Sequence, residues 1–189
     1  MKKFLQLIAY YLAPLTALAV LVIFPERELL NYSGYVALYT IVLILFIKPI
    51  GIILNWRILK RLILLRREMG VFSFWAALLH GVGYLIRANF DLDLKISSPF
   101  LWGYIALFLI ILLGITSNNI SVRILRLNWK RLQYLAYPAL VVAMLHVELV
   151  KMRTFYITLS LTALFIILKI WEKKKLSYRK EIVETEDPE

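Results

Sequence analysis

Two histidines are the residues of this sequence best suited to hold a metal. The chain has no cysteine, and His80 and His146 are its only histidines. Both lie inside long apolar runs, where an ionisable side chain is costly and is a functional candidate by default. A neutral imidazole can offer one ring nitrogen to a metal. The missing cysteines exclude disulfides, thiolate zinc sites and cysteine-bound iron–sulfur clusters.

The two histidines are predicted to lie at similar depth. The separation between the basic Arg67 and His80 differs by only two residues from the separation between the basic Arg131 and His146. If both segments are helices that run in the same direction, this difference amounts to about 3 Å of rise. Level imidazoles on parallel helices suit the two axial positions of one haem iron. The spacing therefore indicates a haem between the two segments.

The residues near the two histidines are suited to a planar macrocycle that carries carboxylate groups at its edge. Small residues such as Gly83 would let a macrocycle approach the backbone, and Tyr84 shares the face of His80. Arg87 and Arg153 each follow a histidine by seven residues, which is two turns along the same helix face. Their guanidinium groups are predicted to pair with the haem propionates.

Other interpretations of the histidines stay open at this point. Histidines in membrane helices also form hydrogen bonds between helices. An arginine at a helix end often extends its side chain to the membrane surface, where its charge is hydrated, without binding any ligand. A magnesium-centred pigment could also take one axial histidine. Zinc is disfavoured because a catalytic site usually needs three protein ligands, and Glu148 is the only nearby carboxylate.

The elements that would position these residues are membrane helices. The chain has 189 residues, 61% of them hydrophobic, against about 45–50% in soluble domains. This excess excludes an ordinary soluble enzyme and a disordered chain. Six apolar stretches have the length of membrane helices, near 4–24, 35–54, 69–90, 100–116, 132–150 and 154–171. The prediction is an all-α membrane protein, a bundle of six transmembrane helices whose first helix is a retained anchor.

The distribution of basic residues predicts the orientation. With the N-terminus inside, 16 lysines and arginines fall on the cytoplasmic side and five on the other. By the positive-inside rule, both termini are expected in the cytoplasm. The net charge of +11 comes from basic residues between apolar runs, so lipid is the expected partner and nucleic acid is not.

Two basic connectors and the chain ends complete the predicted organisation. Residues 55–68 and 120–132 mix apolar and basic positions as interfacial helices do, and they are expected to lie on anionic headgroups. The alternative for them is a docking surface for an anionic cofactor such as FMN. The predicted divisions are an anchor helix and outer loop at 1–34, a membrane domain at 35–171 and a charged, loosely ordered cytoplasmic tail at 172–189.

Several short motifs, taken in order, resemble a known family. They are Arg66-Arg67-Glu68-Met69-Gly70, Leu78-Leu79-His80 with Tyr84-Leu85, Thr116-Ser117-Asn118, Trp129-Lys130-Arg131-Leu132 and Leu145-His146. Their order is similar to that of the ferric-reductase-like transmembrane domain, over residues 35–171. Within that family the chain looks like a small bacterial haem-binding branch that serves a periplasmic methionine-sulfoxide reductase.

The resemblance implies a six-helix bundle that carries b-type haem and passes electrons across the bacterial inner membrane, from a quinol or flavin donor. His80 and His146 would be the axial ligands. The chain departs from the pattern at Gln133, where the family usually has histidine. Because an amide is a poor haem ligand, a single haem is expected, and the inner part of the electron path is in doubt.

The predicted function is therefore that of an electron-transfer subunit, which delivers electrons to an acceptor on the outer face. Such a protein is an oxidoreductase subunit rather than a complete enzyme, and it implies a protein redox partner or a larger membrane complex. The alternative is a structural or assembly subunit that keeps the fold and has lost the redox relay.

Overall fold

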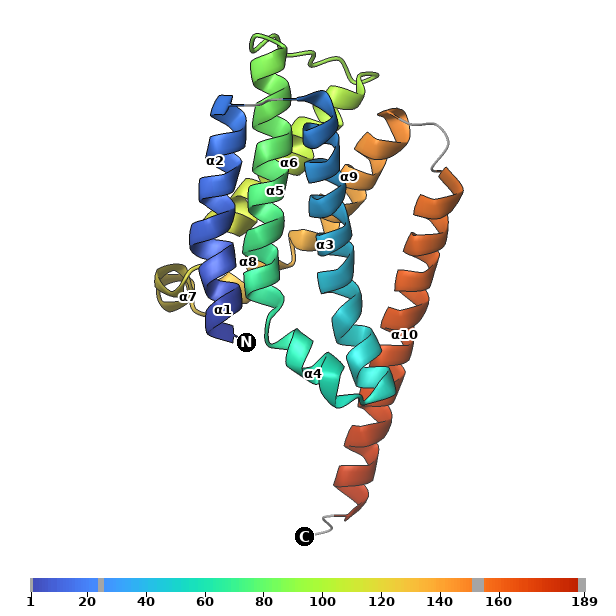
Figure 1. Ribbon diagram of the computed structural model, residues 1–189. Coiled ribbons are helices and arrows are strands. Elements are labelled where there is room, and N and C mark those ends of the chain that lie inside the picture. Colours follow the sequence, from blue (N-terminus) through green and yellow to red (C-terminus); the bar gives the residue numbers. More distant parts are fainter. Residues whose placement is uncertain (1, 24–25, 151–154, 187–189) are drawn as a thin grey trace.

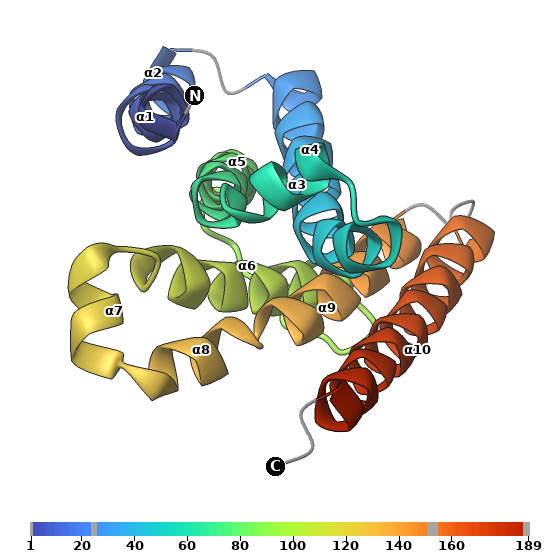
Figure 2. The same ribbon diagram turned by 90° about the horizontal axis from the view of Figure 1, so that it is seen from below.

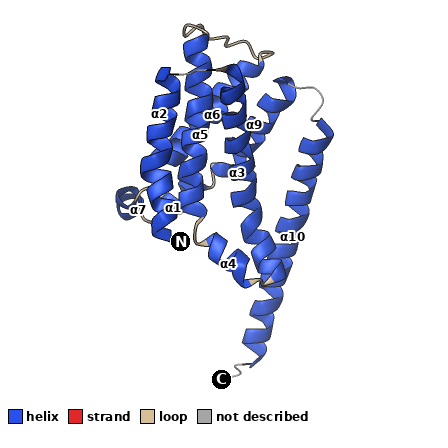
Figure 3. Ribbon diagram, in the orientation of Figure 1, coloured by secondary structure: helices blue, strands red, loops and turns tan. Residues whose placement is uncertain are grey.

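The structure is a bundle of helices joined by short connections (Figures 1 and 3). The computed structural model describes residues 2–23, 26–150 and 155–186. The helices are α1 (Lys2–Leu7), the π-helix η1 (Ile8–Leu12), α2 (Ala13–Ile23), α3 (Arg27–Leu54), α4 (Arg57–Ile63), α5 (Arg66–Arg87), α6 (Pro99–Ile115), α7 (Asn119–Leu125), α8 (Leu127–Gln133), α9 (Ala136–Val150) and α10 (Phe155–Glu186). None of the described residues forms a strand. The all-α class predicted from composition is confirmed.

Several of these helices have the length and composition needed to cross a membrane. Among the described residues they are α3, α5 and the continuous stretch Leu127–Val150, which joins α8 and α9. α6 and α7 together form a fourth candidate, bent by 89° at their junction. The apolar helix Ile8–Ile23 is shorter. The count of six membrane helices and the cytoplasmic position of both termini stay predictions.

Two segments expected to be irregular are helical. α3 begins at Arg27, inside the expected outer loop, and its first turns already carry the fully buried Leu30. α10 continues without a break through Glu186, past the expected start of a loose tail at 172. The segment 155–186 contains no glycine or proline and is rich in lysine and glutamate, which favour helix.

Four helices enclose the centre of the molecule. α3 packs along α5, and α6 packs along α9, as Figures 1 and 2 show. Their shared core consists of Ala37, Ile41, Leu45, Ala77, Ile110, Ala139, Leu140 and Met144. The N-terminal helices η1 and α2 lie against α5. The small residues in this core allow the helices to approach closely.

The two ends of the bundle differ in chemistry. One end carries the short helices α4, α7 and α8, and we call it the basic end; in Figure 2, α7 and α8 form a hook outside the bundle. Asn118 caps α7 by accepting a hydrogen bond from the N–H of Ser121 at 2.7 Å. The Trp129 indole donates to the Thr116 carbonyl at 2.8 Å. The opposite end, formed by the 88–98 connection, is called the loop end.

A cluster of charges attaches α10 to the basic end of α3. Glu172 is buried and pairs with Lys48 at 3.4 Å and with Lys169 at 2.8 Å. Lys175 Nζ donates to the Ile53 carbonyl of α3 at 2.6 Å. These contacts provide partners for Lys48 and Lys169, the two lysines that lie within apolar runs of the sequence.

Candidate functional site

A cavity of about 530 Å³ lies between α3, α5, α6 and α9 and includes both histidines in its lining. Cofactor and ligand sites typically measure about 300–1,000 Å³. Most of the lining is apolar, with polar side chains concentrated at a few positions. We call it the histidine cavity. Its size and its contrast between apolar walls and few polar groups are typical of a cofactor site.

The two imidazoles face this cavity from α5 and α9. The ring centres of His80 and His146 lie 6.2 Å apart, and the ring planes are inclined by 72°. Two imidazoles on one metal have ring centres roughly 6 Å apart, since each metal–nitrogen bond is about 2 Å. The observed separation therefore fits two imidazoles on a single metal, and the cavity beside them has room for a large ligand.

Both histidines are held through the same ring nitrogen. His80 Nδ1 lies 2.7 Å from the Leu30 carbonyl of α3, and His146 Nδ1 lies 2.8 Å from the Pro99 carbonyl of α6. A carbonyl oxygen only accepts, so each Nδ1 must carry the proton and donate. In the neutral ring, Nε2 then keeps its lone pair. Metal-binding histidines are commonly oriented by a hydrogen bond of this kind.

Each histidine ring also packs against a glycine that lies one helical turn after the residue whose carbonyl accepts its hydrogen bond. A Cβ at Gly34, four residues after Leu30, would lie 2.7 Å from His80 Nδ1. A Cβ at Gly103, four residues after Pro99, would lie 2.9 Å from His146 Nδ1. Real Cβ contacts are almost never this short. Each ring is thus fixed by the same pair of features, a carbonyl and a glycine on the neighbouring helix.

A few other polar side chains line the cavity beside the histidines. The exposed Arg27, in the first turn of α3, belongs to the lining. The Tyr84 hydroxyl donates to Asn31 Oδ1 at 2.7 Å, which joins α5 to α3. The Tyr84 ring meets the His80 ring edge-on, with centres 5.1 Å apart. These contacts fix the position of Tyr84 beside the histidine.

The other predicted site residues lie in different surroundings. Tyr84 belongs to the lining of the histidine cavity. Gly83 instead lies against the Leu30 side chain, so it serves the packing of α5 on α3. Arg87 is exposed at the last residue of α5, and the arginine among the described lining residues is Arg27. Arg153 lies outside the described residues.

Sequence reasoning missed the residues that orient the imidazoles. Gly34 and Gly103 are isolated glycines in apolar helices, where glycine costs about 0.5–1 kcal/mol relative to alanine. This cost is a signal that the position has a packing or functional role. The carbonyls of Leu30 and Pro99 leave no signal in the sequence, because every residue has one. Arg27 is one of the five basic residues expected on the outer side, and nothing in its spacing assigns it to the site.

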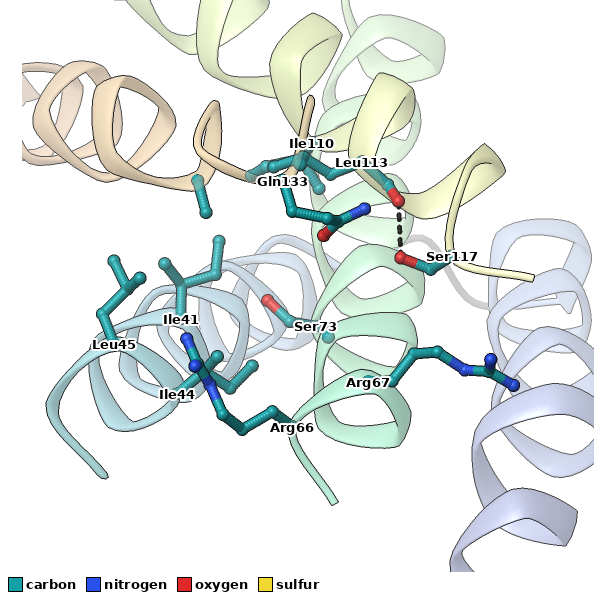
Figure 4. A pocket seen from close by; sticks show the side chains of 12 residues that line it. Ile41, Ile44, Leu45, Arg66, Arg67, Ser73, Ile110, Leu113, Ser117 and Gln133 are labelled. Carbon is teal, nitrogen blue, oxygen red and sulfur yellow. Dashed lines mark hydrogen bonds between the residues drawn. The ribbon is translucent and has the colours of Figure 1, made fainter. Parts of the chain in front are cut away.

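A second, smaller pocket lies towards the basic end (Figure 4). Its volume is about 80 Å³, and its lining includes Arg66 of α5 and Gln133 of α8. We call it the Arg66–Gln133 pocket. It holds the glutamine that stands where the resemblance leads us to expect a histidine. Its volume is too small for a macrocycle, in contrast to the histidine cavity.

The fold and the cavity together define a class of protein. It is a helical membrane protein in which two histidines on facing helices meet at a cavity of cofactor size. A family model described as ferric reductase like transmembrane component matches residues 33–144. The chain belongs to this family, and the matched region contains α5, α6 and most of α3 and α9.

Curated relatives are similar over much of the chain. A protein-methionine-sulfoxide reductase heme-binding subunit MsrQ of Brucella anthropi is 33% identical over 131 residues, which are 65% of this chain and 56% of that protein. Proteins of the same name from Brucella ovis and Brucella canis are 30% identical over 131 residues. The match thus spans little more than half the length of these relatives. No solved structure matches the chain.

Proposed function

We propose that this protein is an electron-transfer subunit of a bacterial inner membrane and binds one b-type haem between His80 and His146. The observation that carries the proposal is the pair of imidazoles, 6.2 Å apart beside a cavity of about 530 Å³, with Nδ1 of each ring bonded to a backbone carbonyl. The relatives are named as heme-binding subunits, which supports the choice of cofactor.

Each group of the site has a role under this proposal. Bound haem supplies one-electron redox chemistry, and the protein sets its potential through ligation, burial and nearby charge. The Leu30 and Pro99 carbonyls keep the Nδ1 protons in place, so Nε2 of each ring is the ligating nitrogen. Arg27, which belongs to the described lining of the cavity, supplies a positive charge that would pair with acidic groups of the cofactor.

The remaining parts of the proposal concern the direction of electron transfer, its donor and its acceptor. A quinol or a flavin such as FMN is the donor on the cytoplasmic side, where both termini and the basic end lie by the positive-inside rule. The acceptor is a protein on the periplasmic side, as expected for a subunit of a methionine-sulfoxide reductase system. Reduction of the purified protein by a soluble quinol, compared with reduction by FMN and a flavin reductase, tests the choice of donor.

The cofactor itself is tested by absorbance. Full-length protein, expressed with δ-aminolevulinate and purified in detergent, should show a dithionite-reduced haem b spectrum. Pyridine haemochrome analysis should give one haem per chain. A colourless preparation would contradict the proposal and favour the structural or assembly role.

Variants then test the ligands. His80→Ala and His146→Ala should each lose the Soret band of a six-coordinate haem, whereas Leu145→Ala should keep it. Leu145 is the neighbour of His146 and is exposed on α9, away from the cavity lining. His80→Gly with added imidazole should recover the spectrum, which separates loss of a ligand from misfolding. Unchanged spectra in both histidine variants would refute the assignment.

A further inference from the structure

The Arg66–Gln133 pocket contains hydrogen-bond donors that have no acceptor. Arg66 Nε and Gln133 Nε2 are both buried and lack a hydrogen-bond partner. They reach the pocket from different helices, α5 and α8, as Figure 4 shows. A buried donor without an acceptor costs about 1–3 kcal/mol, and more when it is charged. Two such donors on one cavity indicate that the pocket takes up an acceptor from outside the chain.

The other polar groups of the lining do not supply this acceptor. The Ser73 hydroxyl donates to the Ala37 carbonyl at 2.9 Å, and the Ser117 hydroxyl donates to the Leu113 carbonyl at 2.6 Å. Arg67 contributes to the lining, but its guanidinium donates to Asn119 Oδ1 at 2.8 Å. No carboxylate is among the described lining residues.

The acidic residues near the pocket do not belong to its described lining. Glu68 Oε1 accepts a hydrogen bond from Gln6 Nε2 of α1 at 3.1 Å, and Glu68 Oε2 is buried without a hydrogen-bond partner. Glu172 is held by Lys48 and Lys169. Glu172 also attracts the Arg66 charge, but Arg66 Nε has no hydrogen-bond partner. A partly buried charge is stabilised further by a counter-charge that contacts it directly.

We propose that the Arg66–Gln133 pocket binds a small oxyanion of the phosphate class, with its oxygens accepting from Arg66 Nε and Gln133 Nε2. The volume of about 80 Å³ holds a few water-sized groups, at about 30 Å³ each, which suits a tetrahedral anion. The group can be free inorganic phosphate or the terminal phosphate of a lipid headgroup. This inference concerns a site separate from the histidine cavity and does not depend on haem.

Thermal unfolding of the full-length protein tests the proposal. In a maltoside detergent and a phosphate-free buffer, added inorganic phosphate should raise Tm in a saturable way, because a ligand of the folded state stabilises it. A parallel arm compares nanodiscs of phosphatidylcholine alone with nanodiscs that also contain phosphatidic acid. A rise only in the second arm identifies the lipid as the source of the phosphate group.

Variants assign the effect to the pocket. Arg66→Gln and Gln133→Leu should each weaken phosphate binding about 10–100-fold, the loss expected for a hydrogen bond to a charged group. Arg61→Gln removes the same charge from an exposed position of α4, outside the described pocket lining, and should keep the binding. If Arg66→Gln fails to fold, Gln133→Leu carries the test, because it leaves the Arg66 charge in place and keeps a similar side-chain volume.

Three results would overturn the proposal. They are no change of Tm with either phosphate or phosphatidic acid, equal loss of binding in Arg61→Gln, or full binding in Gln133→Leu. Water would then be the acceptor in the pocket. The haem spectrum reports independently on the histidine cavity, so the two proposals fail separately.

Discussion

Replacement of Gly34 by alanine tests how the histidine pair is positioned. The new methyl group would lie 2.7 Å from Nδ1 and 2.8 Å from Cε1 of His80. Since carbon contacts are favourable at about 3.5–4.0 Å, the ring has to move by about 1 Å. Such a shift breaks the 2.7 Å hydrogen bond to the Leu30 carbonyl and turns the ring away from its orientation towards the cavity.

The size of the effect follows from these contacts. Overpacking costs about 1–3 kcal/mol, and the lost hydrogen bond about 0.5–1.5 kcal/mol. Removal of an outer-shell contact to a metal ligand typically lowers metal affinity about 10–100-fold. We expect Gly34→Ala to lose haem about 10–100-fold faster on that basis, and the free energy of unfolding to fall by about 1–3 kcal/mol.

The rate of haem loss is measured by transfer to excess apomyoglobin, followed at the Soret band. Gly103→Ala should behave alike, because its Cβ would lie 2.9 Å from His146 Nδ1. Gly70→Ala is the matched control: it lies on the same helix as His80, and no atom lies within 4 Å of the Cβ that alanine would add there. If Gly34→Ala retains haem as long as Gly70→Ala does, the glycine does not position the ring.

Further variants test the helix contacts. Gly83→Ala should lower the free energy of unfolding by about 1–3 kcal/mol, because its Cβ would collide with Leu30. The double variant with Leu30→Ala should lose less than the sum of the two single losses, and additive losses would contradict the contact. Glu172→Gln should lower the free energy of unfolding by about 1–3 kcal/mol, which is less than for a fully buried ion pair because Lys48 is partly exposed. Lys174 is exposed, so Lys174→Gln should leave Tm unchanged. Asn118→Ala should cost about 1 kcal/mol by removing the cap of α7; an unchanged Tm would show that the cap adds nothing to stability.

The helical class and the histidine pair could be predicted from the sequence. Apolar stretches of about 20 residues identify membrane helices. The number of residues between each histidine and the arginine before its helix was enough to place His80 and His146 at similar depth. The reason is that every residue of a helix adds the same rise, about 1.5 Å. The structure brings their rings together, with centres 6.2 Å apart.

Contacts across helices could not be predicted in the same way. Spacing along α5 puts Arg87 two turns beyond His80, but it does not say which helix lies opposite, so Arg27 of α3 was overlooked. Gly83 is small like the residues that face a ligand, yet it is small because Leu30 packs on it. The packing of one helix on another determines these roles, and a single sequence does not reveal that packing.

The central claim is that two imidazoles share one haem, and electron paramagnetic resonance of the oxidised, purified protein tests it most directly. Two imidazole ligands produce a low-spin ferric signal, and ring planes inclined by 72° make that signal strongly anisotropic. Ligation by both histidines predicts such a low-spin spectrum, with conversion to high spin or loss of haem in His80→Ala and in His146→Ala. A high-spin spectrum of the unmodified protein, or a low-spin spectrum that survives both substitutions, would contradict it.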